Sequence, residues 1–322
     1  MNEFALIDRY FRRTVRDSAV RHGVGDDGAV VSPAPGCDLV LSVDMLVEGR
    51  HFLPGVDPAT LGHKTLAVNL SDMAAMGAKP RWALLAGALP DADEQWLAEF
   101  SRGLFALADR FEVALVGGDT TRGPRNLCLT IAGEVPAGTA LTRAGASIGD
   151  DIYVSGMLGD AALALAVLQG RASLGSAALA TARARLESPE PRVGLGQCLR
   201  DIATSAIDLS DGLTGDLCHI LDQSHVGATI DLASIPRSGA LAAIIDHEHR
   251  ALGVSCLLAG GDDYELCFTA DAARRDTLAD ISRHTGVPLT RIGTVTAGTG
   301  LVVRDEQGAP LPAAPQAFDH FG

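Results

Sequence analysis

Acidic residues flanked by glycine, serine or threonine recur where the sequence predicts that strands begin or end. Hard divalent cations such as Mg²⁺ take oxygen ligands, often a few carboxylates together with substrate phosphates. Glycine beside an acid also lets a bulky anion approach the backbone. The acids, one of them on a predicted helix, are Asp26, Asp27, Asp44, Asp72, Asp119, Asp208, Asp211, Asp262 and Asp263. The pattern therefore predicts a phosphate ligand bridged by metal ions.

Each of these acidic motifs also has a plainer interpretation as a turn, because aspartate and glycine favour turn conformations for local reasons. Their recurrence at so many strand ends is what that interpretation explains poorly. The chain contains no GxxxxGK[ST] loop, so a nucleotide could not be held in the P-loop manner. Metal ions would then carry most of the charge neutralisation.

The acid on the helix is Asp72, within the segment AVNLSDMAAMGA at Ala67–Ala78. At 3.6 residues per turn it shares a face with Val68, Ala75 and Met76, which form a packed stripe. A lone acid on a helix is usually solvated, whereas one that emerges from such a stripe can point into a polar cavity. Beside the acids at the strand ends, Asp72 is best interpreted as a residue that bridges metal ions.

Apolar patterning and turn residues predict the elements that would position these acids. In the first half we expect strands over 29–32, 37–43, 82–89, 112–116 and 126–135, and helices over 2–16, 58–78 and 93–111, with Asp57 as the cap before Pro58. In the second half we expect strands over 151–155, 205–209, 228–232 and 266–269, helices over 160–168, 173–186, 213–223 and 239–248, another helix after Pro191, and a tail of one helix with two or three strands. Strands and helices do not alternate strictly, so the fold class is α+β, with helices packed on mixed sheets.

A loop-like segment over 136–150 separates the two halves. A length of 322 residues also suits two domains of ordinary size. We therefore expect an N-terminal domain over residues 1–137 and a C-terminal domain over residues 138–322.

Three glycines, Gly23, Gly25 and Gly28, satisfy the GxGxxG pattern. A dinucleotide-binding fingerprint follows an apolar strand and begins a helix. Here the glycines instead precede the short predicted strand 29–32 and a proline-rich turn. We reject the dinucleotide interpretation.

Composition excludes several classes of partner and location. With 40 acidic and 26 basic residues the formal net charge is −14, and no basic stripe suits a nucleic acid. The six cysteines form no CxxC pair, which is typical of reduced thiols in a cytoplasm. No stretch approaches ~18 uninterrupted apolar residues, so we expect a cytoplasmic protein that does not enter a membrane.

Taken together, the motifs resemble those of the thiamine-monophosphate kinase family, within a superfamily that includes aminoimidazole-ribonucleotide and selenophosphate synthetases. They span nearly the whole chain in order and are GDDGA, SVDMLVEGRHF, AVNLSDMAAMGA, GGDTTRG, LTR, IDLSDGL, GGDDYELCF and the terminal FDHF. The resemblance implies an N-terminal domain that pairs with a second copy across a strand-built barrel, giving a homodimer. It also implies that ATP, several Mg²⁺ ions and thiamine monophosphate meet in a cleft between the two domains.

The resemblance assigns roles to individual positions. Implied metal ligands are Asp27, Ser42, Asp44, Asp72, Asp119, Asp208 and Asp211, together with the backbone carbonyl of Val43. Implied nucleotide contacts are Gly118, Asp119, Arg143 and Ser210, and implied contacts to the thiamine substrate are His51, Asp262 and Phe318. The catalytic positions are Asp72, Asp119 and Asp211.

Two positions depart from the pattern of relatives. Asp262 stands where some relatives have glutamate, and its side chain is one methylene shorter. Pro315 stands where relatives carry an aromatic residue before the terminal run, which leaves Phe318 as the candidate to stack on the thiamine ring.

The implied reaction needs no dedicated general base. A phosphate monoester has a second pKa near ~6, so the attacking oxygen is already largely anionic at neutral pH. The difficulty is to bring two polyanions together, which positioning and charge neutralisation would achieve. Two alternatives stay open: another ATP-using enzyme of the superfamily acting on an amide or selenide, and a non-catalytic nucleotide- or metal-binding regulator.

Overall fold

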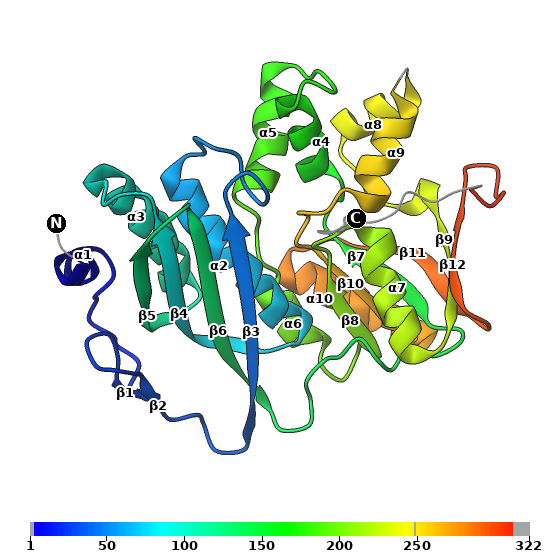
Figure 1. The fold of residues 1–322 in the computed structure, drawn as a ribbon. Coiled ribbons are helices and arrows are strands. Elements are labelled where there is room, and N and C mark those ends of the chain that lie inside the picture. The colour runs from blue at the N-terminus through cyan, green and yellow to red at the C-terminus, as the bar shows by residue number, and fades with distance from the viewer. Residues whose placement is uncertain (1–2, 248, 312–322) are drawn as a thin grey trace. The chain divides into compact units, whose positions relative to one another are not determined.

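The computed structural model describes residues 3–247 and 249–311, and this part of the chain forms two compact units. The first unit comprises the residues up to Met73 together with Ala78–Gly138, and the second comprises Ala74–Gly77 and the described residues from Thr139 on. Both units combine helices with a sheet, as the predicted α+β class requires (Figure 1). Within the described residues, no helix has the length and apolar character needed to cross a membrane.

The first unit is built on a four-stranded sheet with the strand order β3-β6-β4-β5 (Figure 1). Its strands are β3 (Cys37–Val47), β4 (Lys79–Leu89), β5 (Ala114–Arg122) and β6 (Asn126–Pro136). The pairs β3–β6 and β4–β6 are antiparallel, whereas β4 and β5 are parallel. The parallel pair requires a crossover, and α3 (Glu94–Arg110) lies between β4 and β5 in the sequence.

Two of these strands are longer than the sequence predicted. β3 runs on to Val47, so Ser42 and Asp44 lie inside a strand and not at its C-terminal end. β5 runs from Ala114 to Arg122, so the segment GGDTTR that carries Asp119 is strand and not the loop that was expected. Glycine and aspartate are depleted in strands, which is why the pattern was interpreted as a turn. Pairing with β4 continues through this segment as far as Arg122.

Helices α2 (Pro58–Ala75) and α3 contact each other through glycine. A Cβ atom on Gly62 would lie 2.1 Å from the carbonyl oxygen of Phe100, and one on Gly103 would lie 1.9 Å from that of Ala59. Any side chain at either glycine would separate the two backbones. Asp93 caps α3 by accepting hydrogen bonds from the amides of Gln95 and Trp96.

From Leu39 to Leu46, the side chains of β3 alternate between a more exposed and a more buried environment. Leu39, Leu41, Val43 and Met45 are 46–68% exposed, whereas Val40 and Leu46 are buried and Ser42 and Asp44 are partly buried. We name the sheet side that carries the four exposed aliphatic residues the open face, and the other side the helix face. A strand with polar residues toward a helix and apolar residues toward solvent reverses the usual pattern.

Before β3, the chain forms α1 (Glu3–Tyr10) and a small antiparallel pair, β1 (Val20–His22) and β2 (Val30–Val31). The expected helix over 2–16 was too long. The residues after Tyr10 include a β-branched Thr14-Val15 pair of lower helix propensity, and Arg13 instead forms two hydrogen bonds to the Asp109 carboxylate at 3.1 Å.

The second unit contains a six-stranded sheet with the order β12-β9-β11-β7-β10-β8, in which only β12 and β9 are parallel. The strands are β7 (Asp151–Ser155), β8 (Ser205–Asp208), β9 (Gly227–Asp231), β10 (Leu266–Ala270), β11 (Leu289–Thr296) and β12 (Gly300–Arg304). Every residue of β7, β8 and β10 is buried, so both faces of the sheet centre are covered. Ile152 and Val154 join the main core on one face, while Tyr153 stacks on Phe268 on the other.

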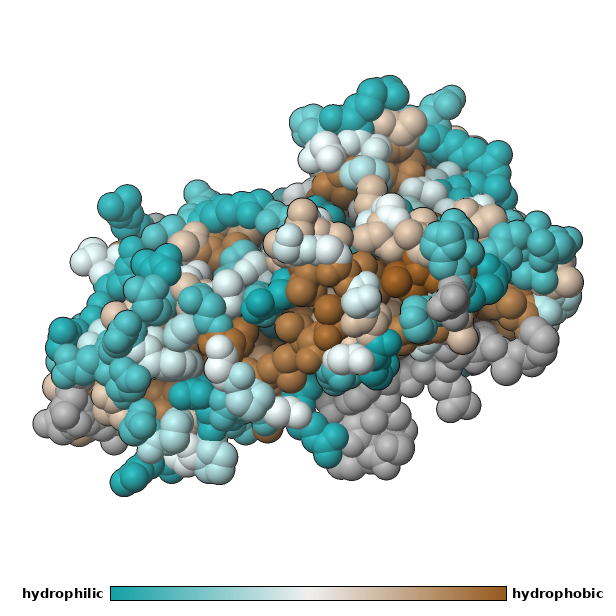
Figure 2. Space-filling model, turned by 90° about the horizontal axis from the view of Figure 1, so that it is seen from above, coloured by the Kyte–Doolittle hydropathy of each residue, from teal (hydrophilic) through white to brown (hydrophobic). Residues whose placement is uncertain are grey.

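The helices of this unit are α4 (Asp160–Leu168), α5 (Ser176–Glu187), α6 (Val193–Leu199), α7 (Leu213–Ser224), α8 (Gly239–Asp246), α9 (Arg250–Ala259) and α10 (Arg275–Thr285), with short 3₁₀ turns at Leu232–Ser234 and Ala272–Arg274. Sequence patterning missed α9, because its glycine and serine weaken the helical signal. Gly253 is required there, since a Cβ would lie 2.6 Å from Ile245 Cγ1 of α8. On the face drawn in Figure 2, hydrophobic patches lie among hydrophilic residues.

Candidate active site

On the helix face of the first unit, β3 and α2 bring a hydroxyl and a carboxylate together. Ser42 donates a short hydrogen bond to Oδ2 of Asp72. Asp44 is two residues further along β3 and therefore lies on the same face as Ser42. Asp72 is partly exposed between buried neighbours, so its carboxylate is the polar point of an otherwise packed helix surface. These are oxygen donors of the kind that Mg²⁺ takes.

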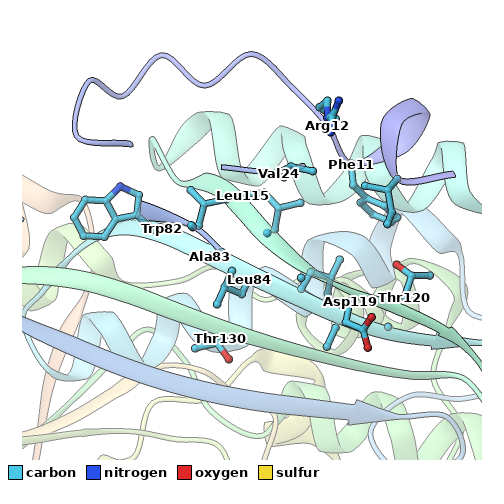
Figure 3. A pocket seen from close by; sticks show the side chains of 18 of the residues that line it. Phe11, Arg12, Val24, Trp82, Ala83, Leu84, Leu115, Asp119, Thr120 and Thr130 are labelled. Carbon is cyan, nitrogen blue, oxygen red and sulfur yellow. The ribbon is translucent and has the colours of Figure 1, made fainter. Parts of the chain in front are cut away.

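A cavity of about 1110 Å³ is lined by β4, β5 and β6 and reaches α1, α3 and the loop before β2. Asp27, Gly118 and Asp119 line it together with Thr120 and Thr130. Figure 3 shows Asp119 and Thr120 at the β5 side of this cavity, with Phe11 and Arg12 on its other side. The cavity thus brings together three of the residues that the sequence singled out.

Strand register separates Asp119 from Ser42 and Asp44. Asp119 pairs with Ala86, which pairs with Cys128, which in turn pairs with Met45 of the open face. Directly paired residues share one face of a sheet. Asp119 therefore lies on the open face, and the predicted metal ligands of this unit divide between the two faces of the sheet.

Gly118 of β5 pairs with Leu85 of β4, and its lack of a side chain lets the two strands lie close together. Its φ is 151°, and an added Cβ would lie 1.8 Å from the carbonyl oxygen of Leu85. In the loop before β2, Gly25 has a φ of 117°, and its Cβ would lie 2.1 Å from a guanidinium nitrogen of Arg12. Gly118 is thus required both by its backbone conformation and by close packing against a backbone, whereas Gly25 is required by its backbone conformation, because the Arg12 side chain can move.

His51 lies in a tight loop that follows β3. Its Nδ1 accepts a hydrogen bond from the Val47 amide at 3.0 Å, and its own amide donates to the Val47 carbonyl, also at 3.0 Å. In the neutral ring this places the proton on Nε2. The amine of Lys64, a residue only 3% exposed, lies 3.4 Å from the His51 carbonyl oxygen.

In the second unit, the acidic motif IDLSDG spans the end of β8 and the start of α7. Asp208 is buried at the end of β8, while Ser210 and Asp211 are partly buried in the loop that follows. Arg143 is exposed in the loop before β7. The Asp262 amide donates a hydrogen bond to the Ser210 carbonyl at 2.8 Å, so the two acidic loops are neighbours in the fold.

The loop of Asp262 is held by a buried ion pair. Arg192 donates from Nε to Oε2 of Glu265 at 2.7 Å, and Ser155 donates to the same oxygen at 2.5 Å. Asp262 and Tyr264 have φ values of 60° and 49°, in the left-handed region that non-glycine residues rarely adopt. The phenyl ring of Phe318 lies outside the described residues, as does Pro315.

The oxygen atoms of these residues can be compared with the ligands that Mg²⁺ takes in proteins. Within residues 3–247 and 249–311, no three His, Cys, Asp or Glu side chains converge as a ready-made metal cluster. Mg²⁺ is usually held by one or two carboxylates, water and substrate phosphates, and not by a complete protein cage. On the helix face, the Asp72 and Asp44 carboxylates and the Ser42 hydroxyl fit that mode of binding. The backbone carbonyl of Val43, on the same strand, is a further oxygen of the kind that Mg²⁺ takes.

Both halves of the chain match a known family of domains. Residues 25–135 match the N-terminal domain of AIR synthase related proteins, and residues 147–306 match the C-terminal domain. Thiamine-monophosphate kinase of Escherichia coli K12 is 49% identical over 322 residues, which cover 99% of this chain and 98% of the relative. The chain belongs to the thiamine-monophosphate kinase family.

Solved structures of thiamine-monophosphate kinases agree with this assignment. The crystal structure of the thiamine-monophosphate kinase from Stenotrophomonas maltophilia K279a is 48% identical, with a TM-score of 0.86 over 94% of this chain and 96% of that one. A structure described as AaThiL complexed with AMPPCP and TMP is 29% identical, with a TM-score of 0.78 over 99% of this chain and 97% of that one.

In this member of the thiamine-monophosphate kinase family, four charged residues near the predicted site residues were not predicted from the sequence. They are Lys64, Arg192, Asp216 and Glu265. A signal for Asp216 was present, because it shares a helical stripe with Leu213, Leu217 and Ile220 and an acid in such a stripe needs a buried partner. Lys64 and Glu265 carried no comparable signal, since charged residues in these contexts are ordinarily exposed.

Proposed function

We propose that this chain transfers the γ-phosphoryl group of ATP to the phosphate of thiamine monophosphate, giving thiamine diphosphate and ADP. The observation that carries the proposal is identity of 49% over the full length of a thiamine-monophosphate kinase. A second support is the similarity over 99% of the chain to AaThiL, which was crystallised with AMPPCP and TMP. AMPPCP carries a methylene group in place of the β–γ bridging oxygen of ATP.

The carboxylates of the acidic motifs would hold several Mg²⁺ ions. In the first unit the residues are Asp27, Ser42, Val43 through its carbonyl, Asp44, Asp72 and Asp119, and in the second they are Asp208 and Asp211. Bound Mg²⁺ would bridge phosphate oxygens and neutralise the charge that develops during transfer. The roles proposed for Asp72, Asp119 and Asp211 are catalytic in this sense, because they would fix the charge that stabilises the reacting phosphates.

Protein groups without a carboxylate would orient the two substrates. Gly118 offers a backbone that a phosphate can approach, and Ser210 offers a hydroxyl. The exposed guanidinium of Arg143 is suited to binding phosphate in bidentate fashion. We assign these three residues, with Asp119, to the nucleotide.

The thiamine substrate is assigned to His51, Asp262 and Phe318. With Nδ1 accepting the Val47 amide, neutral His51 presents Nε2 as a hydrogen-bond donor. The left-handed backbone of Asp262 is held by the Ser210 carbonyl. No general base is required, because the phosphate of thiamine monophosphate is largely dianionic at neutral pH, and positioning supplies the rate acceleration.

We further infer a homodimer formed through the open face. Leu39, Leu41, Val43 and Met45 form a continuous exposed apolar row on β3. An exposed apolar row on a sheet is typical of a surface that another protein covers. In the same proposal, residues 1–137 carry dimerisation and part of the nucleotide site, and residues 138–322 complete the cleft. The protein would act in the cytoplasm, where its six free cysteines stay reduced.

The test is an assay of the purified chain with ATP, Mg²⁺ and thiamine monophosphate, in which thiamine diphosphate is measured by chromatography. Thiamine and adenosine monophosphate serve as control acceptors. Product only from thiamine monophosphate supports the proposal. A different enzyme of the superfamily is favoured if no thiamine diphosphate forms but ATP is consumed when an amide or selenide acceptor is present. A regulator is favoured if the chain binds the nucleotide without turnover.

A further inference from the structure

The loop between β8 and α7 carries Ser210 and Asp211, and it is shaped by a carboxylate that follows it. Oδ2 of Asp216, in the first turn of α7, accepts hydrogen bonds from the amides of Asp211 and Gly212, both at 3.1 Å. The Asp216 amide donates back to the Gly212 carbonyl at 3.0 Å. Gly212 and Asp216 are therefore bonded reciprocally, and the helix start and the loop form one rigid piece.

The Asp216 carboxylate is turned toward the loop and away from solvent. The residue is 3% exposed and lies on the buried side of α7, among Leu213 and Leu217. A carboxyl group that is removed from water needs hydrogen bonds to offset the lost hydration, and the amides of Asp211 and Gly212 supply them.

The opposite side of the same loop is bound to the segment that carries Asp262. The Asp262 amide donates to the Ser210 carbonyl, and the Tyr264 amide donates to the Leu209 carbonyl, both at 2.8 Å. There is no spare room between the segments, because a Cβ on Gly261 would lie 2.6 Å from the Ser210 carbonyl oxygen. A shift of the Ser210 carbonyl would therefore move the backbone of Asp262.

We propose that Asp216 is a positioning residue that holds Ser210 and Asp211 directly and Asp262 through them. This rests on the proposed function, in which Ser210 and Asp211 contact nucleotide and metal while Asp262 contacts thiamine monophosphate. Asp216 touches neither substrate. One buried carboxylate would thus set the geometry of both substrate contacts in the second unit, so its loss should weaken both affinities together.

The decisive variants separate the position of the acceptor from its charge. Asp216→Asn keeps an acceptor oxygen at the same place without the charge, whereas Asp216→Glu keeps the charge but displaces it by one methylene. Asp216→Ala removes the acceptor. Asp222→Ala is the matched control, because Asp222 is an exposed acid on the same helix. Circular dichroism and thermal melting first establish that each variant folds.

Two measurements are made on the full chain: hydrogen exchange of the peptide that covers residues 209–213 without ligands, and KM for ATP and for thiamine monophosphate with kcat. We expect Asp216→Ala and Asp216→Glu to speed loop exchange and to raise both KM values about tenfold, with a smaller change in kcat. For Asp216→Asn, both KM values should stay within about threefold of those of the wild type. For Asp222→Ala, both KM values and the loop exchange should equal those of the wild type. If Asp216→Ala fails to fold, the KM values and loop exchange of Asp216→Asn and Asp216→Glu are compared instead, and they decide whether the position of the acceptor matters.

The positioning role is overturned if Asp216→Glu or Asp216→Ala leaves loop exchange and both KM values at the level of Asp222→Ala, or if only one KM changes. It is also overturned if Asp216→Asn is as impaired as Asp216→Ala, since charge and not position would then matter. Failure of the wild type to make thiamine diphosphate is a different result. It would remove the proposed function, while the exchange measurement would still report whether Asp216 holds the loop.

Discussion

The hydroxyl of Ser42 donates a hydrogen bond to Oδ2 of Asp72, and this contact joins the central part of β3 to the second half of α2. It is a direct side-chain link between two residues that we propose as metal ligands in the first unit. The hydrogen bond holds the Asp72 carboxylate beside the Ser42 hydroxyl. The pair defines where a cation on the helix face would bind.

Replacing Asp72 by Asn should abolish turnover while the fold is preserved. The amide keeps the size of the side chain but cannot neutralise a cation, and loss of one such electrostatic contact typically lowers kcat by at least about 100-fold. Steady-state kinetics and circular dichroism measure the two effects. Asp91→Asn, at an exposed turn after β4, is the control and should behave as the wild type. Near-normal activity of Asp72→Asn would contradict the bridging role.

Ligand binding should stabilise the chain in a metal-dependent manner. In the proposed function, the carboxylates of the acidic motifs are neutralised when Mg²⁺ and a nucleotide bind, and a ligand that binds only the folded chain stabilises it. At a ligand concentration of about 100 times Kd the gain is about 2.7 kcal/mol. We expect AMPPCP with Mg²⁺ to raise Tm by several degrees, and AMPPCP with a chelator to have little effect. An unchanged Tm at saturating ligand and Mg²⁺ would argue against a shared metal site.

Two glycines of the segment GGDTTRG should respond differently to substitution. At Gly118 an added Cβ would lie 1.8 Å from the Leu85 carbonyl oxygen, so Gly118→Ala must move one strand and should cost roughly 2–4 kcal/mol of unfolding free energy. At Gly123 the nearest atom would be Ala88 Cβ at 3.5 Å, an ordinary contact. Gly123→Ala should therefore cost less than about 1 kcal/mol. Urea unfolding of both variants measures the difference, and equal stabilities would show that β5 relaxes freely.

Asp151 makes the stability of the second unit depend on pH. Burial raises the pKa of Asp151, but hydrogen bonds and charge from Arg275 and Arg291 outweigh it and hold the pKa below the usual 3.8. A lowered folded-state pKa stabilises the fold above pH 3.8, and this contribution is lost as pH falls through the folded-state value. Asp151→Asn should thus be destabilised by about 1–2 kcal/mol at pH 7, since both arginines are about half exposed.

The difference between Asp151→Asn and the wild type should shrink steadily below pH 3.8. Chemical denaturation at a series of pH values measures it. Asp276→Asn, an exposed acid on α10, is the control and should show no such trend. A difference that stays constant down to pH 2 would mean that the carboxylate charge is not what Arg275 and Arg291 stabilise.

A charged residue on the open face should prevent the dimer that we infer. Leu41 is 68% exposed in the middle of the apolar row of β3. Placing Asp there should convert a dimer into a monomer, because a buried carboxylate without a partner costs several kcal/mol. Light scattering after gel filtration measures the mass. Leu53→Asp, in a loop outside β3, should leave the mass unchanged, and a wild type that is monomeric at micromolar concentration would contradict the inference.

Much of the fold was readable from the sequence because apolar patterning and caps agree with it. β7 and α4 have the bounds that the pattern predicted, and α2 begins at Pro58 as expected. The fold class and the family were confirmed by the matched domains and the relatives. The sequence could not reveal that β5 continues through Gly117 and Gly118, because only pairing with β4 makes that backbone favourable.

The candidate site was predicted as a set of residues but not as an arrangement. Which face of the sheet each acid occupies depends on register, and the register of β5 shifts at an irregularity before Leu84. The sequence therefore could not place Asp119 on the face opposite Ser42. It also could not identify Lys64 or Glu265, because only the fold supplies the carbonyl and guanidinium groups that make their burial possible. The individual roles of the site residues stay predictions.

The alternation along β3 limits how the gene for this chain can change. Deleting or inserting one residue between Leu39 and Met45 would exchange the two faces of the strand, turning aliphatic side chains toward Asp72 and carboxylates toward the open face. Both the proposed metal ligands and the apolar row would be lost in one event. Length variation among homologues should therefore be absent from this strand and tolerated in the turn before it, around Gly36, where an added side chain meets open space.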